Sequence, residues 1–264
     1  MSVSLRIGII GGGGWLGGAI ASSILDSGLV DPRNLSLSYR SWQPDRFPYS
    51  FWTTDSQELA DRSDVILLSI RPDDWYPFAL DASDKLVISV MAGIRLGVLS
   101  ERHRTGRVVR ALPNAAAEVG KSYTPWIGSN DITSDDRAVV RAIFETCGSE
   151  DEVASESDID YLTGLSGSGP AFPALLAAAM MRDAVASGLP AEVARRAVNT
   201  VISGAGRLLE RRNDCPDDVV QTFLDYRGTT AVAIEGMRAS GFDAAVANGL
   251  SAAFKKSVSI GDAS

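Results

Sequence analysis

The sequence is poor in the residues that most often build metal centres and covalent catalytic sites. Its 264 residues include one histidine, His103, and two cysteines, Cys147 and Cys215, which lie far apart with no motif around them. We therefore predict no metal. Two isolated cysteines fit a protein kept reduced in the cytoplasm. His103 stands in Glu101-Arg102-His103-Arg104, which is typical of a solvated helix end.

Long apolar runs and an excess of basic residues are also missing. No uncharged apolar stretch approaches the ~20 residues needed to span a bilayer. The first seven residues lack the basic region and apolar run of a signal peptide. A net charge of −8 argues against nucleic acid or an anionic membrane as a partner. The remaining composition, 45% hydrophobic and 22% charged, is typical of a soluble globular protein.

The pattern of apolar residues changes near residue 155. Before it, short β-branched runs alternate with helical patterns, as in βαβ units with a parallel sheet. The predicted strands are 5–10, 35–39, 64–70, 86–91 and 108–112, and the predicted helices include 15–27 and 134–144. We predict an α/β Rossmann domain, doubly wound with a mostly parallel sheet, over residues 1–155. An all-α domain is predicted over residues 156–264.

The second half reads as Ala-rich helices. They are predicted at 170–186, 191–210, from 216 onward, at 229–240 and at 243–257. So many small residues allow closely packed backbones but give little bulky core. We expect this half to bury further surface against a second copy, in a homodimer or higher homo-oligomer. A self-contained bundle is the alternative.

A glycine-rich segment follows the first predicted strand. Gly12-Gly13-Gly14-Trp15-Leu16-Gly17 satisfies GxGxxG and opens a predicted helix. In dinucleotide sites the first glycine permits a tight turn, the second lets pyrophosphate approach, and the third allows close helix–strand packing. These roles fall to Gly12, Gly14 and Gly17, while the helix N-terminus at Trp15 and Leu16 presents N–H groups to the phosphates. A flexible turn is the alternative, but the strand–turn–helix context favours a dinucleotide site.

The end of the second strand identifies the dinucleotide. An NAD site carries an acid there for the ribose 2′-hydroxyl, whereas this chain reads Ser38-Tyr39-Arg40-Ser41-Trp42. Arg40 suits a 2′-phosphate, with Ser41 as a second donor, although an exposed loop arginine is the alternative. We therefore predict NADP, with NADPH preferred over NADH. The other candidate cofactor-binding residues are Ser56, Ser69, Arg71, Pro72, Met91, Ala92, Gly93 and Asn114, most of which follow a predicted strand.

Taken together, these segments resemble the pyrroline-5-carboxylate reductase family, whose members make proline from a cyclic imine. Residues 87–94 look like the family's strand-to-Ala-Gly turn, and 110–114 are similar to its Arg-x-Met-Pro-Asn motif. Residues 166–172, Ser-Gly-Ser-Gly-Pro-Ala-Phe, resemble its most specific signature, and 228–230 look like the end of its Ser-Pro-Gly-Gly-Thr-Thr turn. The resemblance covers nearly the whole chain. It implies a Rossmann domain followed by a helical domain that interlocks with another subunit.

The chain departs from the family in the last of these turns, which reads Asp225-Tyr226-Arg227-Gly228-Thr229-Thr230. In the family, the first serine and last threonine of this turn help hold the substrate carboxylate. The resemblance therefore implies substrate contacts from Asp225, Arg227, Gly228 and Thr229 and a catalytic contact from Thr230. Ala178 stands where the family often has an acid. These departures predict low activity on pyrroline-5-carboxylate.

Hydride transfer to a C=N bond needs little acid–base equipment, because a protonated imine is already electrophilic. The lack of a convincing catalytic His, Cys or Lys agrees with that reaction. Ser168 is the second candidate catalytic residue. It is predicted to cap the helix beginning at Pro170, and its loop is predicted to pack beside the nicotinamide. Its glycine-rich setting is no nucleophile elbow, because no strand precedes it. We expect an NADPH-dependent reductase of pyrroline-5-carboxylate. The alternatives are a reductase of a different imine and a non-catalytic NADP-binding scaffold.

Overall fold

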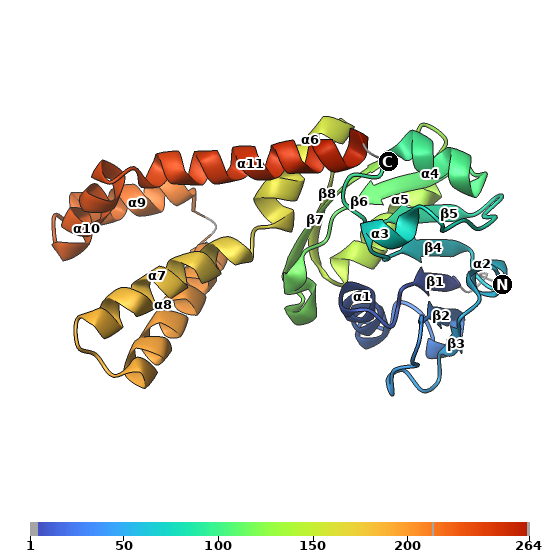
Figure 1. The fold of residues 1–264 in the computed structure, drawn as a ribbon, viewed down its shortest axis with the longest axis horizontal. Coiled ribbons are helices and arrows are strands. Elements are labelled where there is room, and N and C mark those ends of the chain that lie inside the picture. Colours follow the sequence, from blue (N-terminus) through green and yellow to red (C-terminus); the bar gives the residue numbers. More distant parts are fainter. Residues whose placement is uncertain (1–4, 213, 263–264) are drawn as a thin grey trace. The chain divides into compact units, whose positions relative to one another are not determined.

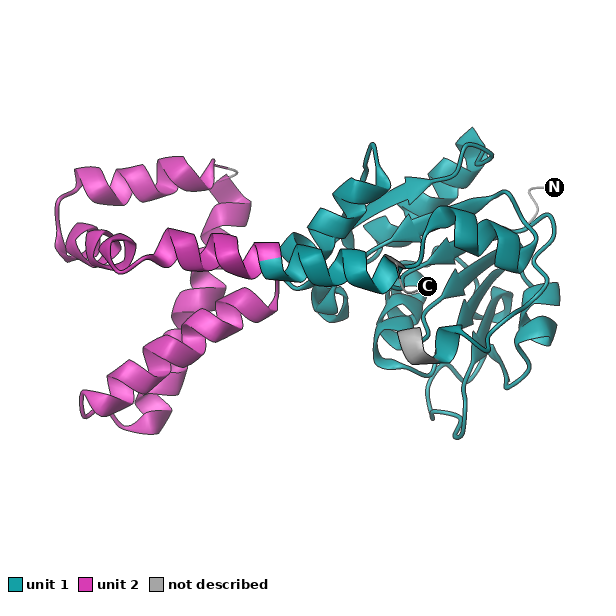
Figure 2. Cartoon of the chain, turned by 45° about the horizontal axis from the view of Figure 1, so that its top comes forward, with its two compact units in different colours: residues 1–168, 252–264 teal, residues 169–251 magenta. Residues whose placement is uncertain are grey.

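Contacts along the chain divide it into two compact units, 1–168 with 252–264, and 169–251 (Figure 2). The computed structural model describes residues 5–212 and 214–262. In these ranges no helix is long and apolar enough to cross a membrane. No cluster of three potential His, Cys, Asp or Glu ligands suits a metal ion in the same ranges.

The first unit is built on an eight-stranded sheet in the order β3-β2-β1-β4-β5-β6-β7-β8 (Figure 1). The strands are β1 (Ile7–Ile10), β2 (Leu35–Ser38), β3 (Phe51–Thr53), β4 (Val65–Leu68), β5 (Leu86–Ser89), β6 (Val108–Ala111), β7 (Ser122–Gly128) and β8 (Gly148–Glu152). Every neighbouring pair is parallel except β6 and β7. The predicted Rossmann architecture is confirmed. The sequence patterns missed β3, β7 and β8.

Helices cover both faces of this sheet. They are α1 (Trp15–Asp26), α2 (Ser56–Asp61), α3 (Pro72–Trp75), α4 (Leu96–His103), α5 (Ser134–Glu145) and α6 (Glu156–Leu162), with short turns η1 (Pro32–Asn34), η2 (Ala115–Val119) and the π-turn η3 (Thr163–Gly167). Because successive residues of a strand point to opposite faces, Ile9 enters one core with α1 and α5. Ile10 enters the other with α2 and α4. Burial on both faces explains the almost uninterrupted apolar strands.

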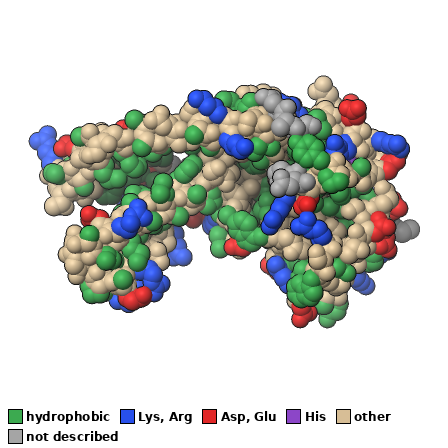
Figure 3. Space-filling view, in the orientation of Figure 1, with side chains coloured by type: hydrophobic (Ala, Val, Ile, Leu, Met, Phe, Trp, Pro, Cys, Tyr) green, Lys and Arg blue, Asp and Glu red, His purple; other side chains and the backbone are tan. Residues whose placement is uncertain are grey.

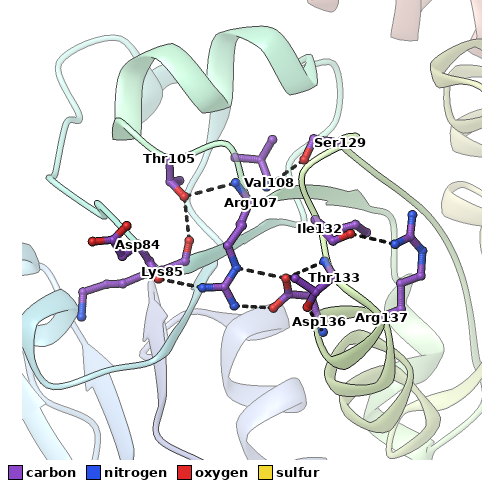
Figure 4. A network of polar contacts seen from close by, with 10 residues as sticks. All are labelled: Asp84, Lys85, Thr105, Arg107, Val108, Ser129, Ile132, Thr133, Asp136 and Arg137. Carbon is purple, nitrogen blue, oxygen red and sulfur yellow. Dashed lines mark hydrogen bonds and ion pairs between the residues drawn. The ribbon is translucent and has the colours of Figure 1, made fainter.

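One ion pair fixes the start of α5 to the sheet (Figure 4). Thr133 and Asp136 form a capping box at the helix N-terminus. Arg107 donates from Nε to Oδ2 of Asp136 at 3.0 Å and from Nη2 to Oδ1, while its Nη1 reaches the carbonyl of Asp84 at 2.7 Å. Burial raises the pKa of Asp136, but hydrogen bonds from Arg107 and Thr133 outweigh it and bring the pKa below its ordinary value of 3.8.

His103 is fully buried, so its prediction as a solvated residue is wrong. Its ring lies edge-on to Trp75 and Phe78, with centroids 5.6 and 5.9 Å apart, and its Nδ1 is 3.2 Å from the carbonyl oxygen of Leu80. Helix α4 ends at His103, and Arg104 takes a left-handed conformation with φ of 55°. Glu101 and Arg104 therefore remain exposed while the imidazole enters the core. Burial lowers the pKa of His103.

The second unit consists of helices. They are α7 (Ala171–Ala186), α8 (Ala191–Arg212), α9 (Pro216–Asp225), α10 (Thr229–Ala239) and the greater part of α11 (Phe242–Asp262), whose last turns belong to the first unit. Few of its apolar side chains are buried; Leu175, Val201 and Val232 are 68%, 53% and 69% exposed. Figure 3 shows hydrophobic side chains gathered on these helices, at the left of the view. The predicted shortage of bulky core within this half is confirmed.

The units differ from the predicted ranges 1–155 and 156–264, because α6, η3 and the end of α11 pack with the sheet. Arg110 of β6 is only 2% exposed. Its Nη1 donates to Glu156 at 2.7 Å and its Nη2 to Asp160 at 3.0 Å. The hydroxyl of Ser257, on α11, lies 3.5 Å from Asp160. This buried cluster joins three segments that are distant in sequence.

Candidate active site

The glycine turn lies where the carboxyl ends of three strands meet. Gly11, directly after β1, has a φ of +83°, and its N–H donates to Oγ of Ser38 at the end of β2. A Cβ on Gly11 would lie 2.3 Å from the carbonyl oxygen of Ser69, which follows β4. The residue that turns the chain is therefore Gly11. Sequence reasoning had given that role to Gly12, since four consecutive glycines carry no local signal of which one turns.

The other glycines keep the turn close to α1. A Cβ on Gly17 would lie 2.4 Å from the carbonyl oxygen of Gly11, and one on Gly14 would lie 3.1 Å from the same oxygen. A Cβ on Gly12 would meet the side chain of Leu37 at 2.7 Å. Gly14 is the N-cap of α1, and no side chain caps the helix. The first backbone N–H groups of a helix lack partners within it. The turn thus has the form of a pyrophosphate cradle.

Trp15 and Leu16 form the first turn of α1 above this cradle. The Trp15 ring is 62% exposed, and its indole N–H donates to the carboxylate of Glu118 on η2. Leu16 packs against the core that α1 covers. Backbone N–H groups, rather than these side chains, are what the helix end offers to an anion.

The residues after β2 reach the same edge of the sheet. The N–H of Gly13 donates to the carbonyl of Ser38 at 3.0 Å, which brings the glycine turn beside the start of the 39–42 loop. Arg40 and Ser41 are exposed. Arg40 donates from Nη1 to Oδ1 of Asp74 at 2.8 Å, with side chains 73% and 38% exposed. Asp74 is a residue that sequence reasoning missed, because it lies on α3, after a different strand.

The remaining candidate cofactor residues follow β3, β4 and β5. Ser56 begins α2, and Arg71 is the N-cap of α3, whose first residue is Pro72. Met91 and Ala92 lie two and three residues after β5, and Met91 is buried. Gly93 has a φ of +82°, and a Cβ there would lie 2.4 Å from Ile260 of α11. The last helix therefore covers this turn on the side of Gly93.

Asn114, after β6, connects three segments. Its Oδ1 accepts from the N–H of Ala116 and caps η2, while its own N–H donates to Oγ of Ser122 at 2.9 Å. Its Nδ2 donates to the carbonyl of Ser166, in η3, at 3.0 Å. This amide thus ties the end of β6 to the most specific signature segment of the chain. π-Turns of this kind are frequent at functional sites.

Ser168 does not cap the helix that follows it, so that prediction is wrong. Its Oγ donates back to the carbonyl of Thr163 at 3.3 Å, and its backbone is helical, with φ of −84° and ψ of −10°. The N-cap of α7 is Pro170, and no side chain caps it. An N-cap serine has a non-helical backbone, typically an extended one. The π-turn places Ser168 in the helical region instead.

The 225–230 turn belongs to the second unit and connects α9 to α10. Asp225, the last residue of α9, accepts from Nε2 of Gln221 at 2.8 Å. Arg227 takes a left-handed φ of 53°, where the family motif has glycine. No ion pair joins Asp225 to Arg227 within the described residues. Gly228 is the N-cap of α10 without a side-chain cap, and Thr229 and Thr230 are the first, exposed residues of that helix.

Comparison with known proteins gives the family. The pyrroline-5-carboxylate reductase of Mycobacterium tuberculosis is 30% identical over 286 residues, covering 96% of this chain and 95% of the relative. The chain belongs to the pyrroline-5-carboxylate reductase family. The family profile for pyrroline-5-carboxylate reductase dimerisation matches residues 156–260, and a profile for NADP oxidoreductase, coenzyme F420-dependent, matches residues 6–93.

Two further likenesses extend over nearly the whole chain. The pyrroline-5-carboxylate reductase of Synechocystis is 28% identical and covers 98% of this chain and 99% of its own length. The crystal structure of Plasmodium falciparum pyrroline carboxylate reductase, with NADP bound, is 26% identical with a TM-score of 0.83, covering 97% of this chain and 98% of that one. Both the fold and the order of the two domains predicted from sequence are those of this family.

Proposed function

We propose that this chain is an NADPH-dependent reductase that adds hydride to the C=N bond of 1-pyrroline-5-carboxylate, giving proline. The observation that carries the proposal is the full-length likeness to pyrroline-5-carboxylate reductases, in a chain whose sheet edge carries a glycine cradle for pyrophosphate. The Plasmodium relative binds NADP. NADP is accordingly the proposed cofactor here.

The cofactor-binding residues have distinct tasks in this proposal. NADPH, when bound, supplies the hydride. Gly12 and Gly17 let the turn pack closely against Leu37 and α1, Gly14 leaves room for the pyrophosphate, and the N–H groups at the start of α1 donate to it. Arg40 and Ser41 donate to the 2′-phosphate, and each charge-assisted contact contributes ~1.5–3 kcal/mol. This gives the preference for NADPH over NADH.

The substrate is held by the start of α10. Its N–H groups, at an N-terminus capped only by Gly228, suit the carboxylate of the imine substrate. Thr230 offers a hydroxyl to the substrate nitrogen or carboxylate, and Thr229 stands beside it in the first turn. Because a protonated imine is electrophilic without further activation, orientation and exclusion of water are the main demands on the protein. Ser168, within the signature segment 166–172, contributes to orienting the reactants.

The 225–227 segment supports a second candidate, reduction of a different imine. Asp225 stands where the family has a serine facing the substrate carboxylate, and among the described residues no ion pair joins it to Arg227. Two carboxylates ~4 Å apart at an effective dielectric near ~20 repel by several kcal/mol. A substrate with a hydroxyl or cationic group at that position would avoid the repulsion.

Assembly of two or more copies through the helical domain completes the proposal. The dimerisation profile and the exposed apolar side chains of the second unit support it. We expect a homodimer or higher homo-oligomer. Light scattering at micromolar concentration that returned only a 28.0 kDa monomer, with activity intact, would contradict it.

Purified protein assayed with NADPH and a panel of cyclic imines tests the function. Turnover of pyrroline-5-carboxylate supports the first candidate, and turnover of another imine alone supports the second. Binding of NADPH without turnover of any imine would point to a non-catalytic scaffold. The variant that tests the Thr230 hydroxyl is Thr230→Val, which keeps the shape of the side chain and removes only that group. It should lower turnover while leaving NADPH affinity unchanged.

A further inference from the structure

We propose that Asp74 is a second determinant of dinucleotide choice, one that moderates the preference that Arg40 creates. The inference rests on the proposed function, because it concerns the same cofactor site. It starts from the ion pair between Nη1 of Arg40 and Oδ1 of Asp74, 2.8 Å apart. Arg40 lies two residues after β2, and Asp74 lies on α3, the helix that follows β4.

Asp74 supplies a carboxylate that the end of β2 lacks. An NAD site uses an acid at that position to accept hydrogen bonds from the ribose 2′-hydroxyl. Here β2 is followed by Tyr39, Arg40 and Ser41, and the acid arrives from α3 instead. The next residue, Trp75, is fully buried in the core, which anchors this helical turn. The helical turn therefore holds the Asp74 carboxylate beside the Arg40 guanidinium.

The geometry leaves room for a ligand on Arg40. Only Nη1 is engaged by Asp74, and the Arg40 side chain is 73% exposed. The remaining nitrogens of the guanidinium can therefore donate to a 2′-phosphate. That phosphate carries almost two negative charges at pH 7 and lies near the Asp74 carboxylate when Arg40 holds it. Repulsion between them weakens NADPH binding, while the same carboxylate favours the 2′-hydroxyl of NADH.

Calorimetric titration of the full-length protein with NADPH and with NADH tests this inference. Asp74→Asn keeps the shape of the side chain and removes the charge. We expect the ratio of the NADH dissociation constant to that of NADPH to rise about tenfold, from tighter NADPH and weaker NADH binding. A purely structural role of Asp74 would weaken both dinucleotides together and leave the ratio unchanged.

Asp64→Asn is the matched control. Asp64 pairs with Arg6 at the amino ends of β4 and β1, at the opposite end of these strands from the candidate site. Its side chain is 35% exposed, close to the 38% of Asp74. The control changes the net charge equally but should leave the ratio unchanged. A ratio in Asp74→Asn equal to that of the control, or lower, would overturn the inference.

The two proposals fail separately. If the unmodified protein reduces the imine with NADPH but Asp74→Asn does not move the affinity ratio, the reductase stands and the role of Asp74 is refuted. If the ratio moves as expected but no imine is reduced, the role of Asp74 stands and the proposed reaction is refuted. The readout is binding, so it does not depend on turnover.

Discussion

The Arg107–Asp136 pair provides a measurable contribution to the stability of the first unit. Asp136 is 4% exposed and Arg107 is 37% exposed at the side chain. Breaking a buried ion pair by removing one partner costs about 3–5 kcal/mol. Because the guanidinium is partly solvated, we discount this figure and expect Asp136→Asn to lower the free energy of unfolding by about 2–3 kcal/mol at pH 7.

Urea denaturation followed by tryptophan fluorescence measures this loss. All five tryptophans lie before residue 168, so their signal reports on the first unit. Asp135→Asn is the matched control, since Asp135 occupies the same helical turn but is exposed. It should change stability by at most about 1 kcal/mol through the helix dipole. Equal losses in the two variants would refute the reasoning.

The pH dependence gives a second check. The pKa of Asp136 is lower in the folded protein than its ordinary 3.8, so the folded state binds fewer protons near that pH. Its contribution is therefore complete well above 3.8 and is lost as the pH falls through the folded value. The stability difference between the unmodified protein and Asp136→Asn should shrink toward pH 3. NADPH affinity should not change, because Arg107 precedes β6 at the edge opposite the candidate site.

Three further predictions concern other parts of the chain. Burial lowers the pKa of His103 from 6.5, so its stabilising contribution is complete above pH 6.5 and is lost as the pH falls from there through the folded value. We therefore expect the free energy of unfolding, measured with urea, to vary less between pH 7 and 5 in His103→Phe than in the unmodified protein. Gly17→Ala should weaken NADPH binding in calorimetry by at least about tenfold, because its Cβ meets a backbone oxygen, whereas Gly97→Ala, with open space, should not. The combined Asp225→Ser, Tyr226→Pro and Arg227→Gly variant should raise kcat/KM on pyrroline-5-carboxylate, and no gain would show that this turn does not limit the reaction.

The sequence predicted the parts of the fold that local patterns determine. Strands such as β1 and β4 are apolar throughout because both faces of the sheet are covered. Strand β8 reads Gly-Ser-Glu-Asp-Glu and has no apolar signal. It is held by pairing with β7 and by Arg141, which binds Glu150 and Glu152. An edge strand stabilised by charges cannot be recognised from periodicity.

Prediction of the site was limited in the same way. The glycine motif and Arg40 could be found in sequence because each lies next to a recognisable strand. The left-handed turn at Gly11 depends on the Ser69 carbonyl of another strand, and Asp74 meets Arg40 across 34 positions. Ser168 was misassigned because a π-turn changes its backbone conformation. The first two misses involve contacts between segments distant in sequence, whereas the Ser168 miss comes from a local change of backbone conformation.

The contact between Gly93 and Ile260 has a consequence for synthesis of the chain on the ribosome. Domains usually fold from the N-terminus as they emerge. Here the cover over the turn after β5 comes from the final helix, and the unit that contains the sheet includes residues from 252 onward. The sheet can begin to form early, but its nucleotide-binding unit is finished only after every residue of the helical unit has been translated. Chains that end before Ile260 would leave this turn uncovered.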